Sequence, residues 1–169
     1  MHWDAVIEFP KMKVAVATRD VNGNPCIAAI RYLPPETATK APGNELAERA
    51  ARQLERYRED PDARFDLPLL IEGTDFQRRV WDAMCAIPRG RTLTYGEMAR
   101  KLDAGGYDMA RVVGQACGDN RLPIVIPCHR VVAASGIGGF SHSTGGYLLE
   151  VKRWLLMHES SAGAFELKP

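Results

Sequence analysis

A thiol and an imidazole stand side by side at Cys128 and His129, directly after Pro127. A free thiol is mostly protonated at neutral pH, and a neighbouring group that favours the thiolate makes it a usable nucleophile. The apolar run 124–126, which ends at the proline, predicts a buried strand that stops and turns. Successive side chains of a straight strand point to opposite faces, so the two groups can meet only if the backbone bends here.

The pair alone does not establish a nucleophile. Free cysteine is among the most buried residue types, so on spacing alone a structural cysteine is the more common interpretation. The chain has four cysteines, and none shares a Cys-x-x-Cys spacing with another: Cys26, Cys85, Cys117 and Cys128. Neither a zinc cluster nor a disulfide framework is therefore predicted, and reduced thiols fit a reducing compartment.

The composition is that of an ordinary globular protein. The 169 residues, 46% of them hydrophobic, allow one substantial core or two small ones. No apolar run approaches the roughly 20 residues of a membrane span, and the N-terminus lacks a signal-peptide pattern, so we expect a cytoplasmic protein, associated with the nucleoid if it is bacterial. The formal net charge of +1 says nothing about nucleic acid, but residues 1–73 carry 10 Lys and Arg against 12 Asp and Glu, whereas residues 74–159 carry 11 against 8. This mild bias permits a phosphate-binding face in the second half without requiring one.

The first half predicts a small α/β lobe. Two extended runs, 13–18 and 25–32, flank a turn-rich cluster at 20–24 and predict a hairpin. Apolar residues then recur at helical spacing over residues 44–58, which predicts an amphipathic helix. A proline-containing stretch to Gly73 indicates a linker, so we expect an N-terminal lobe over residues 1–73 and a second domain over residues 74–169.

The second half predicts mainly helices. Thr74 and Gln77 form a capping-box pattern at the start of one helix, and two short helical patterns follow at 94–102 and 109–117, joined by a glycine-containing connection. The pair has the outline of a helix-turn-helix. Its second helix presents small or polar residues, namely Ala110, Arg111, Gly114 and Gln115. Small residues let a helix approach DNA closely without reading its sequence, unlike a major-groove reader. A last amphipathic helix is predicted over residues 145–159.

The segment Pro-Cys-His-Arg-Val at 127–131, with Asn120 eight residues before the cysteine, resembles the active-site signature of the O6-alkylguanine-DNA alkyltransferases. This family is also called the methylated-DNA–protein-cysteine methyltransferases. The likeness covers residues 74–159, and its parts occur in the family's order. It implies a two-lobe α/β fold, with a small antiparallel sheet and a ribonuclease-H-like roll in the N-terminal lobe and a helix-turn-helix in a mainly helical C-terminal lobe.

The resemblance also implies an activity. A family member binds double-stranded DNA through the minor groove and flips out O6-alkylguanine, chiefly O6-methylguanine, with O4-methylthymine as a further substrate. The alkyl group moves irreversibly to a cysteine, so each molecule acts once as a methyltransferase. The resemblance implies no cofactor, no metal and no membrane partner, and a monomer whose cooperativity on DNA stays open.

Carried over by motif, Cys128 is the acceptor and His129 the base that takes its proton. Glu159 resembles the acidic residue that orients the imidazole through water; by itself it would be taken for a solvent-facing residue at a helix end. Tyr95 resembles the tyrosine that pushes on the lesion's phosphate and donates a hydrogen bond to the departing guanine. Arg111 resembles the arginine that fills the space of the extruded nucleotide, where the alternative is a phosphate-facing or solvated side chain.

The remaining residues surround this centre. Asn120 resembles the asparagine that ties its turn to the Cys128 segment. The DNA-facing set implied by the resemblance is Thr94, Tyr95, Ala110, Arg111, Gly114 and Gln115. The implied substrate pocket comprises Val131, Gly138, Gly139, Phe140 and Ser141. Many members have Tyr where Phe140 stands, and the segment 141–144 is longer than usual, so both departures affect the lid of the alkyl pocket.

Two rival classes remain open. A Cys-His hydrolase would turn over through a cleavable acyl intermediate, and only Glu159 could serve as its third residue. A pure binding module would be either a helix-turn-helix regulator or a lesion-binding relative without a nucleophile. The presence of Cys128 counts against the latter, and the small side chains of the second helix count against a regulator.

Overall fold

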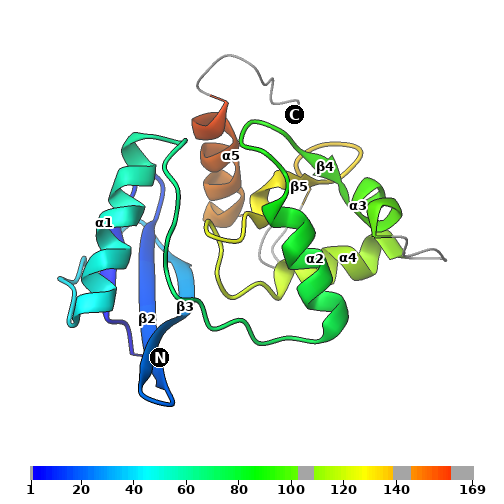
Figure 1. The fold of residues 1–169 in the computed structure, drawn as a ribbon. Coiled ribbons are helices and arrows are strands. Elements are labelled where there is room, and N and C mark those ends of the chain that lie inside the picture. The colour runs from blue at the N-terminus through cyan, green and yellow to red at the C-terminus, as the bar shows by residue number, and fades with distance from the viewer. Residues whose placement is uncertain (1, 103–108, 139–145, 161–169) are drawn as a thin grey trace. The chain divides into compact units, whose positions relative to one another are not determined.

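The computed structural model describes residues 2–102, 109–138 and 146–160. The chain forms two compact units, Met1–Glu72 and Gly73–Pro169 (Figure 1). In chain order the elements are β1 (Ala5–Glu8), β2 (Lys13–Val21), β3 (Asn24–Leu33), α1 (Glu45–Glu59), α2 (Asp75–Cys85), β4 (Leu93–Thr94), α3 (Tyr95–Lys101), α4 (Met109–Gly118), η1 (Cys128–Arg130), β5 (Val131–Val132) and α5 (Tyr147–Glu159). The mixed α/β class with an antiparallel sheet agrees with the prediction.

The N-terminal unit is built on an antiparallel sheet in the order β1-β2-β3. The predicted hairpin is confirmed: β2 and β3 turn at Asn22 and Gly23, whose φ angles are 52° and 81°. A two-residue turn with both φ values positive matches the twist of paired strands, which is why Asn-Gly suits this position. β1 is an additional strand that the sequence did not indicate, because four residues are too few to show a period.

Helix α1 covers this sheet and contacts all three strands. Asn44 caps its start, accepting a hydrogen bond from the Ala47 amide at 2.8 Å. The buried face is spaced at helical intervals, as predicted, and comprises Leu46, Ala47, Ala50, Ala51, Leu54 and Tyr57. The proposed ribonuclease-H-like roll stays a prediction for this unit.

The C-terminal unit begins with α2 and the predicted capping box. Thr74 Oγ1 accepts from the Gln77 amide at 3.1 Å, and Gln77 Oε1 accepts from the Thr74 amide at 2.9 Å. The buried face of α2 includes Trp81, whose Nε1 donates to the Ala116 carbonyl of α4 at 2.8 Å. Because α3 also packs on α4, the two helices of the predicted helix-turn-helix are held together. Their connection, residues 103–108, lies outside the described residues.

Removing this helix cap should lower the stability of the protein without altering the residues around Cys128. We expect Thr74→Ala to lower the free energy of unfolding by about 1 kcal/mol, because the Gln77 backbone amide in the first turn of α2 loses its partner. Urea unfolding measures the effect. Thr39→Ala, at an exposed position outside any helix or strand, is the matched control and should change the free energy of unfolding by less than about 0.5 kcal/mol. Equal effects of both substitutions would contradict the capping argument.

The strand predicted over residues 124–126 is wrong. The segment is a loop in which Ile124 has a φ of 74°, and the short strand β5 follows the Cys128 turn instead, pairing in parallel with β4. The apolar run reflects burial rather than strand pairing, because Leu122, Ile124 and Ile126 are all buried. The Asn120 side chain binds the Leu122 amide and the Ile126 carbonyl, which holds the segment in a turn.

Candidate active site

Cys128 and His129 lie in the short 3-10 helix η1, so the backbone bend that their cooperation requires is present. The Cys128 amide donates to the Ile126 carbonyl at 2.8 Å, which tightens the turn in front of the thiol. Pro127 precedes it with a ψ of 69°. Both side chains are buried, the thiol with 6% of the residue exposed and the imidazole with none. The nucleophile candidate is therefore enclosed by protein on most sides.

Glu159, the last residue of α5, lies directly against His129. Its Oε2 is 2.8 Å from the imidazole Nε2, and only 1% of the residue is exposed. The expectation of a bridging water is wrong, because 2.8 Å leaves no room for one. The solvent-facing alternative is also wrong. A buried carboxylate at this distance orients the ring and favours the tautomer that carries its hydrogen on Nε2.

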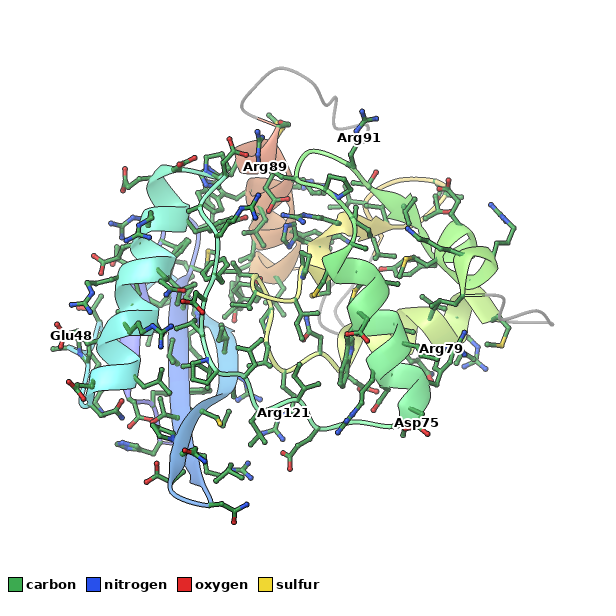
Figure 2. The ribbon with its side chains drawn as sticks, in the orientation of Figure 1. Glu48, Asp75, Arg79, Arg89, Arg91 and Arg121 are labelled. Atoms are coloured by element: carbon green, nitrogen blue, oxygen red, sulfur yellow. The ribbon has the colours of Figure 1, made fainter. Side chains whose placement is uncertain are left out.

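Arg130 is a member of this cluster to which the sequence had assigned no role. Its Nε donates to Glu159 Oε1 at 2.9 Å and its Nη2 to Oε2 at 3.0 Å, a bidentate pair. Its third nitrogen donates to the Ile87 carbonyl at 2.6 Å. Arg89, on the loop after α2, donates to the main-chain carbonyl of Glu159 and so completes the end of α5 (Figure 2). The only available signal was the position of Arg130 next to His129 in the motif.

The charges of this cluster shift the ionisation of its members. Burial by itself raises the pKa of the Glu159 carboxyl, but His129 and Arg130 beside it outweigh burial and hold that pKa well below its ordinary value. Burial lowers the pKa of the His129 imidazole, and Glu159 raises it only in part because Arg130 and Lys152 also lower it. At neutral pH the carboxylate is ionised and the imidazole is uncharged, which is the state of a base ready to accept a proton.

Lys152 is a second residue that the sequence had not singled out. It is fully buried on α5, and its Nζ donates to the Val131 carbonyl at 2.9 Å. The same nitrogen is 5.9 Å from the centre of the Tyr95 ring, within range of a cation–π contact. Burial lowers the pKa of the ammonium to about 8, although the thiols of Cys128 and Cys117 act to raise it. A positive charge therefore stands near the candidate nucleophile.

The two buried thiols differ in their surroundings. Burial raises the pKa of Cys128, while the Asn120 side chain and the Lys152 ammonium act to lower it. Burial raises the pKa of Cys117 to about 12, with Cys128 adding to the rise, and its Sγ lies 3.6 Å from Met84 Sδ. Cys128 thus has more of the groups that stabilise a thiolate.

Tyr95 is the first residue of α3, behind Thr94, whose hydroxyl caps the helix by accepting from the Glu97 amide at 3.0 Å. The ring has close neighbours on two sides. A Cβ added to Gly114 would lie 3.8 Å from it, and one added to Gly138 would lie 3.3 Å from it. Burial raises the pKa of the Tyr95 phenol to about 12, with Cys117 and Cys128 adding to the rise, so the hydroxyl keeps its proton at neutral pH and can donate it.

Asn120 joins the two ends of the loop before the nucleophile. Its Nδ2 donates to the Ile126 carbonyl at 2.8 Å and its Oδ1 accepts from the Leu122 amide at 2.9 Å. The contacts match the structural role implied by the resemblance. The same side chain acts on the Cys128 thiol in the direction of a lower pKa.

The residues expected to face DNA lie on α4 and at the start of α3. Ala110, Arg111 and Gln115 are exposed, whereas Gly114 is half-buried against Tyr95. Of the expected pocket residues, Val131 is fully buried in β5 and Gly138 has a φ of 77°. Gly139, Phe140 and Ser141, with the longer segment 141–144, lie outside the described residues.

A metal site is not found among the described residues, where no group of three or more His, Cys, Asp or Glu side chains could hold an ion. All four cysteines are free thiols. No helix in the described ranges is long and apolar enough to cross a bilayer. The expectation that the protein needs neither metal nor cofactor stays a prediction.

The arrangement is suited to nucleophilic chemistry. It combines an enclosed thiol, an uncharged imidazole fixed by a buried carboxylate, a nearby ammonium and a protonated phenol. Such a set can generate a thiolate and supply a hydrogen bond to a leaving group. Helices α3 and α4, which carry small and basic exposed side chains, lie next to this set of groups. Tyr95 begins α3, lies against Gly114 of α4 and is close enough to Cys128 for the thiol to affect its pKa.

Comparison with known proteins shows which family this is. Residues 75–161 match the family model described as "6-O-methylguanine DNA methyltransferase, DNA binding domain", which covers about half of the chain. The chain therefore belongs to the 6-O-methylguanine DNA methyltransferase family, as the Pro-Cys-His-Arg-Val segment predicted.

Individual relatives agree with this assignment. The chain is 41% identical over 118 residues to a methylated-DNA–protein-cysteine methyltransferase of Methanosarcina acetivorans, covering 69% of this chain and 71% of the relative. It is 44% identical over 119 residues to the protein of that name from Mycobacterium tuberculosis, covering 70% and 68%. The crystal structure of M. tuberculosis O6-methylguanine methyltransferase superimposes with a TM-score of 0.71 at 34% identity, covering 92% of this chain and 91% of the other. The crystal structure of M. tuberculosis OGT in complex with DNA gives the same TM-score at 36% identity.

Proposed function

We propose that this protein repairs DNA by moving the alkyl group of O6-alkylguanine, chiefly a methyl group, to the sulfur of its own Cys128. The names of its relatives and the DNA complex of the M. tuberculosis protein support DNA repair by alkyl transfer to a cysteine. The observation that carries the assignment to Cys128 is the buried thiol of the family motif in one short turn with the His129–Glu159 pair.

The proposed step is a single displacement. His129 takes the thiol proton, and the thiolate attacks the alkyl carbon. The carbon–oxygen bond breaks and its electron pair stays on guanine O6. The Tyr95 hydroxyl donates a hydrogen bond that stabilises the negative charge on the departing guanine, and the proton that His129 took from the thiol balances that charge. The product is a thioether, which water does not readily cleave, so each molecule acts once.

Access to the thiol requires that the base leave the duplex. Cys128 is 6% exposed, and a thiolate in such a site cannot reach an atom of a stacked base. We place the duplex against α3 and α4, with the minor groove facing Ala110 and Gln115 and with Arg111 in the space of the extruded nucleotide. The finer assignments, namely the domain boundary at residue 73, a monomer, O4-methylthymine as a further substrate and a cytoplasmic or nucleoid location, belong to the same proposal.

Intact-mass measurement tests this function. The protein is mixed with a duplex containing one O6-methylguanine, and peptide mapping then locates any added mass. We expect one methyl group per protein molecule, on Cys128, with no further turnover in excess substrate. An unmodified protein, repeated turnover, or a methyl group on Cys85 or Cys117 alone would contradict the proposal, and hydrolytic turnover of an ester would favour the hydrolase alternative.

Arg111 should contribute to DNA binding but not to the displacement. We expect Arg111→Ala to weaken binding of a lesion-containing duplex about tenfold, because one exposed cation and its stacking surface are lost. The dependence of affinity on salt should also become less steep. Fluorescence anisotropy at several salt concentrations measures both. Arg153→Met is the matched control, since Arg153 is paired with Glu150 at 2.9 Å on α5, and it should bind as the unaltered protein does.

A further inference from the structure

The Glu159 carboxylate is shared between two side chains of η1. Its Oε2 lies 2.8 Å from His129 Nε2 and 3.0 Å from Arg130 Nη2, whereas its Oε1 lies 2.9 Å from Arg130 Nε. The guanidinium therefore fixes the plane of the carboxylate, and the imidazole contacts only one of the two oxygens. A planar bidentate pair of this kind has a narrow range of allowed geometries.

A carboxylate alone would be poorly suited to this place. Glu159 is the last residue of α5, where the helix dipole disfavours negative charge, and it is 1% exposed. An unopposed carboxylate beside an imidazole also favours the imidazolium. A histidine that is already protonated cannot accept the thiol proton.

Arg130 offsets both the buried negative charge at the end of α5 and the tendency of that charge to protonate His129, because the guanidinium is always charged and is paired with Glu159. Three other kinds of group act on this cluster. Lys152 of α5 is a buried cation and Arg89 binds the Glu159 main-chain carbonyl. On α2, Asp82 raises and Arg130 lowers the pKa of the Cys85 thiol, whose burial also raises it. Glu159 is therefore the acid that contacts His129, and Arg130 is the cation that contacts Glu159.

We propose that Arg130 is a positioning residue for alkyl transfer: it fixes the Glu159 carboxylate against His129 and offsets its charge, so that the imidazole remains an uncharged base at neutral pH. The inference rests on the proposed function, in which His129 accepts the proton of Cys128. Arg130 acts on His129 through Glu159 and through its own charge, which also lowers the pKa of the imidazole, and it touches neither the Cys128 thiol nor the departing guanine in this scheme. The segment thus contains a nucleophile, its base and the residue that keeps the base uncharged, one after another.

The rate of methyl transfer as a function of pH tests the proposal. Single-turnover rates are measured by quenching and intact mass between pH 5 and 9, with the fold checked by circular dichroism. In Arg130→Met the acidic limb of the profile should move to higher pH by about one unit, which lowers the rate at pH 7 by up to about threefold and lets it recover at higher pH. In Arg130→Lys the limb should stay near its original place, because the charge is kept, while the plateau falls.

A double variant separates positioning from packing. If Arg130 acts in part through the carboxylate, Arg130→Met should move the limb less in a Glu159→Gln background than in the unaltered protein. Arg153→Met is the surface control and should leave the profile unchanged. A uniform loss of rate with an unmoved limb in Arg130→Met, or an equal further shift in the Glu159→Gln background, would overturn the inference. Failure of the proposed function itself is distinct, because the unaltered protein would then acquire no methyl group at any pH.

Discussion

Cys128→Ala should abolish methyl transfer while leaving the protein able to bind a duplex that contains O6-methylguanine. The sulfur is the only atom assigned to accept the alkyl group, so the rate should fall by at least about a thousandfold, to no detectable mass increment. The substitution removes one small buried atom, and no hydrogen bond of the His129–Glu159–Arg130 cluster involves it. Intact mass measures transfer, and anisotropy with the same duplex measures binding.

Cys117→Ala is the matched control, because it removes a second buried thiol from the same surroundings. Burial and Cys128 raise the pKa of Cys117 to about 12, so this thiol stays protonated and should contribute no nucleophile. The control should therefore transfer one methyl group as the unaltered protein does. If Cys117→Ala were inactive and Cys128→Ala active, the nucleophile would be the other thiol and the motif-based assignment would be wrong.

The helices of this protein were predictable because their signals are local. The capping box at Thr74 and Gln77 marks the start of α2, and the hairpin turn at Asn22 and Gly23 needs only neighbouring residues to form. The loop before Cys128 was not predictable in this way. Its alternating apolar residues are buried by the surrounding chain, and the Asn120 contacts that hold it as a loop could not be read from a pattern.

The site shows the same division between local and distant information. His129 and Glu159 are thirty positions apart, and only the family resemblance joined them before the structure showed their contact. Arg130 stood in the motif, but its bidentate pairing depends on how α5 ends. Lys152 could have been found, because Leu155, Leu156 and Glu159 follow it at helical spacing and all are buried. A lysine on such a face contradicts the usual exposure of lysine, and that contradiction is itself a signal.

Lys152→Met should make the protein more stable and slower. Burial lowers the pKa of the folded-state ammonium from 10.5 to about 8, a shift that corresponds to a cost of about 3 kcal/mol at neutral pH. Methionine has a similar length and carries no charge, so much of this cost should disappear. The hydrogen bond from Nζ to the Val131 carbonyl is lost as well, and we therefore expect a net gain of about 2 kcal/mol in the free energy of unfolding.

The pH dependence of this gain follows from the direction of the shift. Below pH 8 the lysine is protonated in both the folded and the unfolded protein, so the full cost of burying the ammonium is present. Between pH 8 and 10.5 the unfolded chain binds one more proton than the folded chain, so the unaltered protein gains stability as the pH rises. The difference between the variant and the unaltered protein should thus be greatest at pH 7 and should shrink towards pH 10. Urea unfolding at pH 7, 8 and 10 measures it.

Whereas Lys152→Met should raise the stability of the protein, it should lower the rate of methyl transfer. The ammonium lowers the pKa of the Cys128 thiol, and its removal should reduce the thiolate available at pH 7, slowing transfer by about ten- to a hundredfold. Lys11→Met, at an exposed lysine of the N-terminal unit, is the matched control and should change neither quantity. A Lys152→Met protein that unfolded more easily than the original, yet transferred the methyl group at the original rate, would show that the buried charge serves the fold and not the thiolate. If Lys152 is buried in order to stabilise the thiolate, the variant should instead have a higher free energy of unfolding and a lower rate of methyl transfer.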